Sequence, residues 1–402
     1  MRILFLTDNF PPETNAPATR TFEHCQAWVE SGAQVTVITC APNFPQGKVY
    51  KGYRNRLYQV EIVKGIRVIR VWSYITKNEG FTRRIVDYIS FAFMSFLVGL
   101  FQKYDIIIAT SPQFFTTWSA VALSKLHRKP WVFELRDLWP ESIRTVGAIK
   151  KSKVLDWLEA VELWLYRDST RVIAVTDAFK GNLIDRGIDV SKIDVVTNGA
   201  NLELYQPCKK NEKLLNQLGL KGKFIIGYIG THGMAHNLDF IVRAIAKVQD
   251  PNIHFLFIGD GAMKKTVVGL AKNLKLKNTT FLEPISKDLV PVYISIIDVS
   301  LAPLIKSETF KTVIPSKIFE ASAMQKPTLL GVEGQAQKII EGYNAGVCYK
   351  PEDEVDFLYK LHKITNQDSY IDLQNGCDKL AHDFDRSQLA DKMLNILTNI
   401  TK

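Results

Sequence analysis

The sequence has few cysteine residues, and none of them form a pair at a metal-binding spacing. Its five cysteines lie far apart along 402 residues, without a C-x-x-C motif. This distribution argues against a zinc site and against a disulfide framework. We expect reduced thiols in the core or at the surface, which suits a reducing, cytoplasmic compartment.

The sequence also lacks a secretory signal and a membrane-spanning run. Residues 1–8 become polar after a few apolar positions, which indicates a buried first strand rather than a signal peptide. The apolar segment 85–101 is shorter than the roughly 20 residues that a spanning helix needs, and it contains Asp87.

A basic segment precedes that apolar stretch. Residues 48–84 contain ten cations and two acids, in a chain of net charge +10. A cationic flank beside an apolar helix favours peripheral contact of residues 48–101 with anionic lipid headgroups. The alternative is a core helix with a solvated, charged neighbour. Nucleic-acid binding is not expected, since no recognised module accompanies the charge.

The fold class expected is α/β, with two Rossmann-like doubly wound domains that face each other across a cleft. The length exceeds what one core usually supports, and short β-rich runs alternate with helical stretches. Expected strands are 3–7, 35–39, 68–71, 106–109, 131–135, 172–175 and 194–196, then 224–229, 253–258, 280–282, 299–302 and 327–330. A polar bridge separates the two series, so we expect domains 1–204 and 205–385. Residues 386–402 are expected to form a helix that packs back on the first domain. Residues 152–167 are expected to form another helix, whose stripe of Trp157, Val161 and Trp164 is expected to lie in the core.

Two loops of the first half are candidates for binding an acceptor or a phosphate, because loops at the carboxyl ends of parallel strands carry ligand sites. The first follows strand 3–7 and enters a helix, whose free amides favour an anion. The second, residues 133–142, holds charges that could position or deprotonate a sugar hydroxyl. The candidates are Pro12, Glu13, Asn15, Thr19, Arg20, Arg136 and Asp137, while Glu134 and Glu141 stay undecided.

Three loops of the second half are candidates for a nucleotide diphosphate. A glycine-rich turn follows strand 224–229, a helix starts at Pro315, and a further turn follows strand 327–330. Lys317 and Glu320 share one helix face, so Lys317 would neutralise a departing diphosphate while Glu320 accepts hydrogen bonds from ribose hydroxyls. The candidates are Gly230, Thr231, His232, Gly233, Asn237, Pro315, Ser316, Lys317, Glu320, Gly331 and Glu333.

These motifs, in this order, resemble the retaining GT-B glycosyltransferases of family 4 over nearly the whole chain. They are the Phe-Pro-Pro-Glu loop at residues 10–13, Arg-Asp-Leu-Trp-Pro at 136–140, Val-Thr-Asn-Gly-Ala-Asn at 196–201 and Pro-Ser-Lys-Ile-Phe-Glu-Ala at 315–321. The chain is most similar to a bacterial surface-polysaccharide subgroup that includes the WbuB-type L-fucosamine (UDP-L-FucNAc) transferases of O-antigen and capsule pathways. The resemblance implies a UDP-sugar donor, often of an N-acetylated amino sugar, and a polyprenyl-diphosphate-linked glycan as acceptor.

Two positions depart from the family pattern. Thr312 stands where the first Glu of a Glu-x7-Glu pair is usual, and Thr231 and Asn237 stand where an Arg and a Lys are common. Lys317 would then have to neutralise more of the negative charge of the diphosphate. The implied reaction retains the anomeric configuration because the donor's own phosphate oxygen helps to deprotonate the acceptor, so neither an enzyme nucleophile nor a metal or other cofactor is expected.

Three other functions compete with that of a transferase. A dinucleotide-dependent oxidoreductase would carry G-x-G-x-x-G after the first strand, where Asn-Phe-Pro-Pro stands instead. A sugar-nucleotide epimerase of the same fold and a non-catalytic, membrane-associated sugar-nucleotide-binding protein stay open. The expected location is peripheral, at the cytoplasmic face of the inner membrane.

Overall fold

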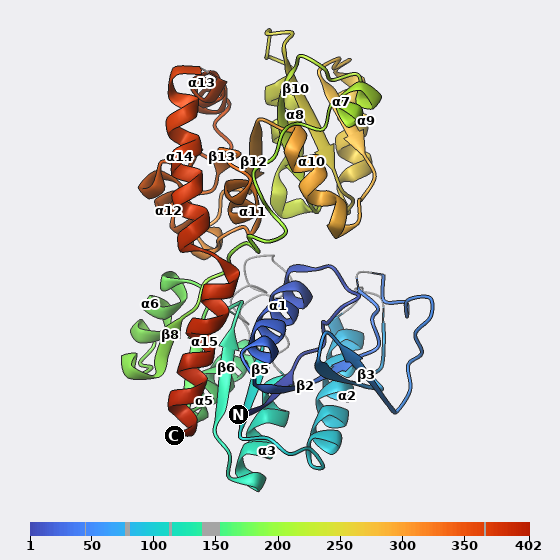
Figure 1. Cartoon of the computed structure of the whole chain (residues 1–402), viewed down its shortest axis with the longest axis vertical. Helices are drawn as coiled ribbons and strands as arrows, with labels where there is room; N and C mark the ends of the chain where they lie inside the picture. The colour runs from blue at the N-terminus through green and yellow to red at the C-terminus, as the bar shows by residue number, and fades with distance from the viewer. Residues whose placement is uncertain (45, 77–80, 112–114, 139–152, 366) are drawn as a thin grey trace. The chain divides into compact units, whose positions relative to one another are not determined.

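The chain forms two compact units in a computed structural model, which describes all residues except 45, 77–80, 112–114, 139–152 and 366 (Figure 1). Unit 1 comprises Met1–Thr197 and Arg386–Lys402, and unit 2 comprises Asn198–Asp385. The division falls before the boundary expected at residue 204. The reason is local: Ala200 and Tyr205 are buried in a core of unit 2, and the Ala200 amide donates to the Phe384 carbonyl at 3.1 Å.

Unit 1 is built on one eight-stranded sheet, of order β3-β4-β2-β1-β5-β6-β7-β8. Its neighbouring strands are parallel except for the β3–β4 pair at one edge. The strands are β1 (Arg2–Leu6), β2 (Gln34–Cys40), β3 (Tyr58–Val63), β4 (Ile66–Val71), β5 (Ile106–Thr110), β6 (Trp131–Leu135), β7 (Arg171–Ala174) and β8 (Ile193–Val195).

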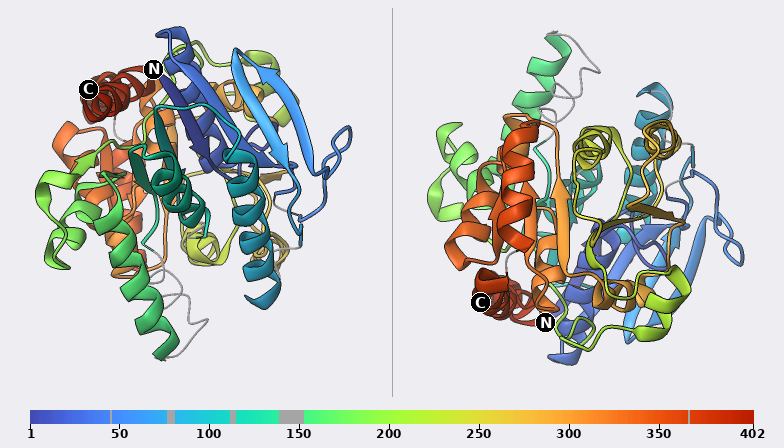
Figure 2. Two further views of the ribbon diagram at one scale, coloured as in Figure 1. Left: turned by 90° about the horizontal axis from the view of Figure 1, so that it is seen from below. Right: turned by 90° about the horizontal axis from the view of Figure 1, so that it is seen from above.

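Helices cover both faces of this sheet (Figure 2). Leu4 and Leu6 of β1 are buried in one core, and Ile3 and Phe5 in the other, as the two-residue period of a strand requires. The helices are α1 (Ala16–Glu30), α2 (Phe81–Gly99), α3 (Thr116–His127), α5 (Lys153–Asp168), α6 (Asp177–Asp185) and the C-terminal α15 (Arg386–Thr401). The helix α15 contacts α1, where the Trp28 indole donates to the Ala390 carbonyl at 2.9 Å.

Unit 2 contains an all-parallel sheet of order β11-β10-β9-β12-β13-β14, which also has a core on each face. The strands are β9 (Phe224–Ile229), β10 (Ile253–Ile258), β11 (Thr279–Leu282), β12 (Val299–Pro303), β13 (Thr328–Gly331) and β14 (Gly346–Cys348). The helices are α7 (Glu212–Leu218), α8 (Leu238–Ile245), α9 (Lys264–Asn273), α10 (Val290–Ile296), α11 (Lys317–Ala323), α12 (Gln335–Tyr343), α13 (Glu354–Thr365) and α14 (Gln367–Asp383), with 3-10 turns η2 (Met234–His236) and η4 (Thr309–Thr312). Two doubly wound α/β units are thus confirmed.

Some expectations differ from the structure. Strands β3 and β14 were not predicted, because β3 is an edge strand with an exposed apolar face and β14 is short. The indole stripe of α5 was expected in the core, yet Trp157 is 57% and Trp164 46% exposed. Among the helices of the described residues, none has the length and apolar content needed to cross a bilayer.

Candidate functional site

The carboxyl ends of β9 and β12 in unit 2 meet where the strand order reverses. Open α/β sheets bind ligands at such a switch point. The loop after β9 leads to α8, and the loop after β12 leads to α11. The two loops touch, because the Ile305 amide donates to the Ala235 carbonyl at 2.9 Å. The structure therefore brings together the glycine-rich turn and the segment around Lys317, as expected.

Backbone contacts fix the conformation of the turn after β9. The Gly230 amide donates to Ile258 at 2.9 Å, and the His232 amide donates to Asp260 at 2.8 Å. The facing loop contains Gly259 and Gly261, both at positive φ, where a Cβ would lie 1.9 Å from the Gly230 carbonyl oxygen and 2.5 Å from that of His232. Only glycine allows this approach. The Gly-Asp-Gly sequence after an apolar strand is the signal from which these two positions could have been predicted.

Lys317 lies across the end of β9. Its Nζ is 3.8 Å from the centroid of the Tyr228 ring, a cation–π contact, and 3.2 Å from where a Cβ of Gly230 would lie. The Tyr228 hydroxyl donates to the Thr231 carbonyl at 2.5 Å, which holds the ring in place. Tyr228 was not among the predicted site residues, since a tyrosine within an apolar strand indicates core packing.

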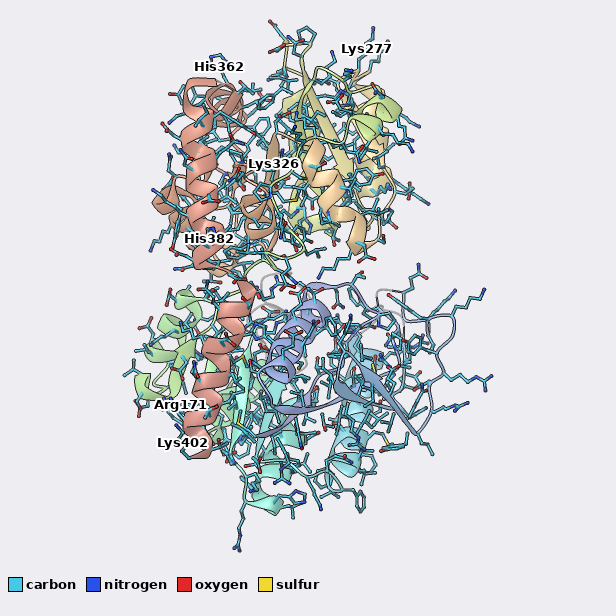
Figure 3. The ribbon with its side chains drawn as sticks, viewed as in Figure 1. Arg171, Lys277, Lys326, His362, His382 and Lys402 are labelled. Carbon is cyan, nitrogen blue, oxygen red and sulfur yellow. The ribbon has the colours of Figure 1, made fainter. Side chains whose placement is uncertain are left out.

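The electrostatics of this site favour an anion. Burial lowers the pKa of Lys317 to about 7, and Glu320 opposes the shift only in part. Another buried lysine of unit 2, Lys326, differs in that its Nζ donates to the Ser295 carbonyl at 3.2 Å (Figure 3). No hydrogen bond joins Lys317 Nζ to an oxygen of the residues that the structure describes. A ligand phosphate would favour its charged form.

The two histidines beside Lys317 are neutral. Burial, with Lys264 and Lys317 adding to it, lowers the pKa of His232 to about 4. Burial and Lys317 do the same for His236. The His232 ring is fully buried, and its centroid lies 5.6 Å from that of Tyr228. The His232 side chain, predicted to bind the donor, therefore lies buried beside the Tyr228 ring, and neither ring nitrogen has a hydrogen-bond partner among the described residues.

The start of α11 offers fewer free amides than expected. The Ile318 amide donates to the Pro315 carbonyl at 3.2 Å, and those of Phe319 and Glu320 donate to Ser316 at 3.1 and 3.5 Å. These three amides are therefore not free for a phosphate. Ser316, Lys317 and Glu320 each keep part of their surface exposed, although the Lys317 amine itself is buried, so side chains rather than a row of amides characterise this site.

The remaining donor candidates divide into two groups. Thr231 is exposed, and Asn237 is in a left-handed conformation with its Nδ2 3.5 Å from the Glu352 carboxylate. Two further candidates lie at the end of β13. A Cβ at Gly331 would lie 2.2 Å from the Tyr349 ring, so only glycine fits beside this ring. Glu333 lies 3.8 Å from Lys311 in an ion pair.

In unit 1, the predicted cations are held within the protein. Arg20 is buried; its Nε donates to Glu134 Oε1 at 2.9 Å, and its terminal nitrogens donate to the carbonyls of Val196 and Thr197. Burial raises the pKa of Glu134, but Arg20 and Arg136 outweigh it and leave the pKa lowered. Arg20 thus joins α1 to β6 and to the two residues that follow β8.

The other candidates of unit 1 surround the start of α1. Asn15 caps this helix, accepting from the Ala18 amide at 2.9 Å. Arg136 donates to the Pro17 carbonyl at 3.1 Å, and burial, opposed by Glu134, lowers its pKa to about 10. Pro12 is exposed and Thr19 half-buried on α1. Asp137 is half-buried, and Glu141 lies outside the described residues.

Known families match both units. Residues 15–199 match the model of the "Glycosyl transferase 4-like domain", and residues 210–383 match that of "Glycosyl transferases group 1". The chain is a glycosyltransferase with the GT-B fold. It is 25% identical over 365 residues to the putative colanic acid biosynthesis glycosyl transferase WcaI of Escherichia coli K12, with 88% of this chain and 89% of the relative covered.

Solved structures agree with this fold assignment. Sucrose-phosphate synthase from Thermosynechococcus elongatus has a TM-score of 0.80 at 16% identity, with 99% of this glycosyltransferase and 98% of that chain covered. HepE of Anabaena, solved in complex with UDP and glucose, has a TM-score of 0.75 at 17% identity, with 99% of each chain covered. At these identities the likeness shows the fold alone.

Proposed function

We propose that this glycosyltransferase moves a sugar from a UDP-sugar to a polyprenyl-diphosphate-linked glycan, with retention, in the synthesis of a bacterial surface polysaccharide. The observation that carries the proposal is Lys317, a buried amine at the switch point of unit 2 with a pKa of about 7. The names of WcaI and of the putative teichuronic acid biosynthesis glycosyltransferase TuaH of Bacillus subtilis support the polysaccharide, and the complex of HepE with UDP-glucose supports the donor.

In the proposed reaction, Lys317 stabilises the charge that develops on the leaving diphosphate. Such stabilisation is commonly the largest single contribution to catalysis. Glu320, one turn along α11, accepts hydrogen bonds from the ribose. A phosphate oxygen of the donor accepts the acceptor proton on the face that the leaving group vacates, and Asp137 positions the acceptor hydroxyl. Because Lys317 supplies the cation, the reaction requires no metal.

We propose further that unit 1 binds the cytoplasmic face of the inner membrane through an exposed apolar face of α2 and β3. Five exposed apolar side chains repeat every three or four residues along α2 and the turn after it: Val86, Ile89, Phe93, Leu97 and Phe101. Such a stripe is unusual for a helix of a soluble protein, whose apolar side faces the core.

The exposed side chains of β3 extend this apolar face. Opposed residues of an antiparallel pair point to the same side of a sheet, and Ile62 is opposite Arg67. Arg67 in turn donates to Gln102 at 2.5 Å, just beyond α2, so the exposed Tyr58, Val60 and Ile62 lie on the side of α2. Exposed cations such as Arg83 and Lys103 would meet anionic headgroups.

For the transferred sugar we propose an N-acetylated amino sugar such as N-acetyl-L-fucosamine. Thr312, whose hydroxyl donates to the Thr309 carbonyl at 2.7 Å, occupies the position that the family usually gives to a sugar-binding Glu. The sugar would therefore be held through fewer carboxylate contacts than in relatives that carry this Glu.

The test is a transfer assay with UDP-N-acetyl-L-fucosamine, other UDP-sugars and a polyprenyl-diphosphate-linked glycan in anionic vesicles. Mass spectrometry of the lipid product gives the sugar added, and NMR of the anomeric proton gives the configuration. We expect a product with the configuration of the donor. Release of UDP without a glycolipid product would refute the transferase, and an inverted product would refute retention alone.

A further inference from the structure

A polar cavity lies in unit 1. It has a volume of about 180 Å³ and lies at the carboxyl ends of β1 and β2, under the first turns of α2. Its lining includes the carboxyl groups of Asp8, Glu13 and Asp87, together with Arg84 and Tyr88. A single water needs about 10–15 Å³, so this cavity has room for a ring-sized ligand.

Glu13 is the least exposed of the three acidic residues. Its Oε1 accepts hydrogen bonds from the amides of Asn43 and Phe44, at 2.7 and 2.8 Å. Its Oε2 is buried and has no hydrogen-bond partner among the described residues, and Glu13 as a whole is only 3% exposed. A buried acceptor left without a donor is costly, so a ligand with a hydrogen-bond donor would stabilise it.

The charges around the cavity disfavour a phosphate. Three carboxyl groups face one guanidinium, that of Arg84, which donates to the Tyr88 hydroxyl at 2.7 Å. The nearby Arg70 is buried and donates to Glu61 at 2.6 Å and to the Cys40 carbonyl at 3.0 Å. Arg20 and Arg136 do not line the cavity. The loop after β1 was expected to bind an anion, whereas the carboxyl groups around this cavity favour a ligand that carries no negative charge.

The protonation of these groups also suits an uncharged ligand. Burial, with Glu13 and Asp87 adding to it, raises the pKa of Asp8 to about 7. Burial, opposed by Arg84, raises that of Asp87 to about 7 as well. Near neutral pH the cluster therefore holds both carboxylates, which accept hydrogen bonds, and carboxylic acids, which donate them. Both kinds of group are complementary to sugar hydroxyls.

We propose that this cavity binds one neutral saccharide ring of the acceptor glycan, whose hydroxyls donate to Glu13 Oε2 and to Asp87, and that it excludes the acceptor diphosphate. The assignment to the acceptor rests on the proposed transferase function. Asp87 faces the cavity while Val86 and Ile89 of the same helix are exposed in the apolar face. A glycan attached to a membrane lipid would thus approach the cavity beside the surface proposed to contact the bilayer.

The test measures binding of methyl glycosides of glucose, galactose and N-acetylglucosamine to the full chain by saturation-transfer NMR. Inorganic pyrophosphate serves as the competitor. We expect at least one glycoside to bind and pyrophosphate not to displace it. Asp87→Asn should weaken binding by about tenfold, the usual effect of losing one charge-assisted hydrogen bond. The exposed Asp391→Asn on α15 is the matched control and should bind as the unmodified chain does.

The same samples separate this proposal from the transferase function. UDP binding is measured on each variant by calorimetry, and the acceptor KM and kcat are measured in the transfer assay. We expect Asp87→Asn to raise the acceptor KM and to leave UDP affinity unchanged. Failure of every glycoside to bind, displacement by pyrophosphate, or unchanged binding in Asp87→Asn would each overturn the saccharide cavity. If the unmodified chain does not bind UDP, that result would instead contradict the proposed transferase function.

Discussion

Both units are doubly wound α/β sheets, but they use their charged residues differently. In unit 1, Arg20 and Glu134 form a buried ion pair that joins α1 to β6. In unit 2, Lys317 lies over the Tyr228 ring with no such carboxylate contact among the described residues. A buried pair stabilises a fold only when both charges are present, whereas a buried amine with a lowered pKa is a candidate for ligand binding. The comparison shows that a charged residue after a strand can serve either purpose.

The largest expected effect tests the structural half of this comparison. We expect Arg20→Ala to destabilise unit 1 by about 3–5 kcal/mol, because it leaves Glu134 buried and unpaired. Thermal unfolding, with hydrogen exchange of amides in α1 and β6, measures the change. Arg171, a half-exposed arginine of the same unit, is the control, and Arg171→Ala should stay within about 0.5 kcal/mol (Figure 3). Equal effects of the two substitutions would show that the buried pair has no special role.

The functional half is tested by Lys317→Ala. If Lys317 holds the diphosphate as proposed, loss of its cation should weaken UDP binding by about 10–100-fold. Calorimetric titration with UDP measures this, and an unchanged melting temperature excludes misfolding. The matched control is Lys311→Ala, since Lys311 is paired with Glu308 at 2.6 Å and should have little effect on UDP. Wild-type affinity in Lys317→Ala would refute the donor site.

The pH dependence of UDP binding sharpens the same assignment. The pKa of Lys317 is lowered to about 7, so its charge is present below pH 7 and is lost as pH rises above it. UDP affinity should therefore fall by up to about tenfold per pH unit above 7, with proton uptake on binding. His232 and His236, with pKa values of about 4, stay neutral over this range. Lys317→Arg should remove the dependence, because a guanidinium keeps its charge; a persisting slope would point to another group.

The smallest expected effect concerns Glu333. It forms a half-exposed ion pair with Lys311, so Glu333→Gln should change UDP affinity by less than about twofold. Glu320→Gln on α11 is the comparison, and we expect a clearly larger loss of UDP affinity there. The UDP titration described above measures both. A strong effect of Glu333→Gln would place Glu333 in the donor site and remove the distinction between paired and binding carboxylates.

Much of the fold could be predicted because both sheets are buried on two faces. Strands such as β5 and β10 consist of nearly continuous apolar residues, which is typical of parallel sheets. The exposed Trp157 and Trp164 were mistaken for core, because periodicity indicates that residues share a helix face but not which face is covered. The edge strand β3 was not predicted for a related reason. It pairs with a neighbouring strand on one side only, so its sequence is not the continuous apolar run of an interior strand.

The candidate site was predictable where the local sequence determines it. The spacing of Lys317 and Glu320 predicted a shared helix face, and the glycines after β9 predicted a close backbone approach. The ring of Tyr228 under Lys317, and the Tyr349 ring that fills the space beside Gly331, come from residues that no local pattern connects to the site. Such contacts depend on the packing of neighbouring strands.

The sequence by itself determined the two-unit α/β architecture, the glycosyltransferase motifs and the helix that starts near Lys317, because these follow from hydrophobic periodicity and short-range spacing. Only the tertiary structure decided which charges are free to bind a ligand. Arg20 and Lys317 look alike in the sequence, each in a helix that follows a strand and a polar loop. Arg20 meets Glu134 from a strand more than a hundred residues away, whereas Lys317 meets the face of Tyr228. The partner of a buried charge is set by strand order, and local sequence does not encode it.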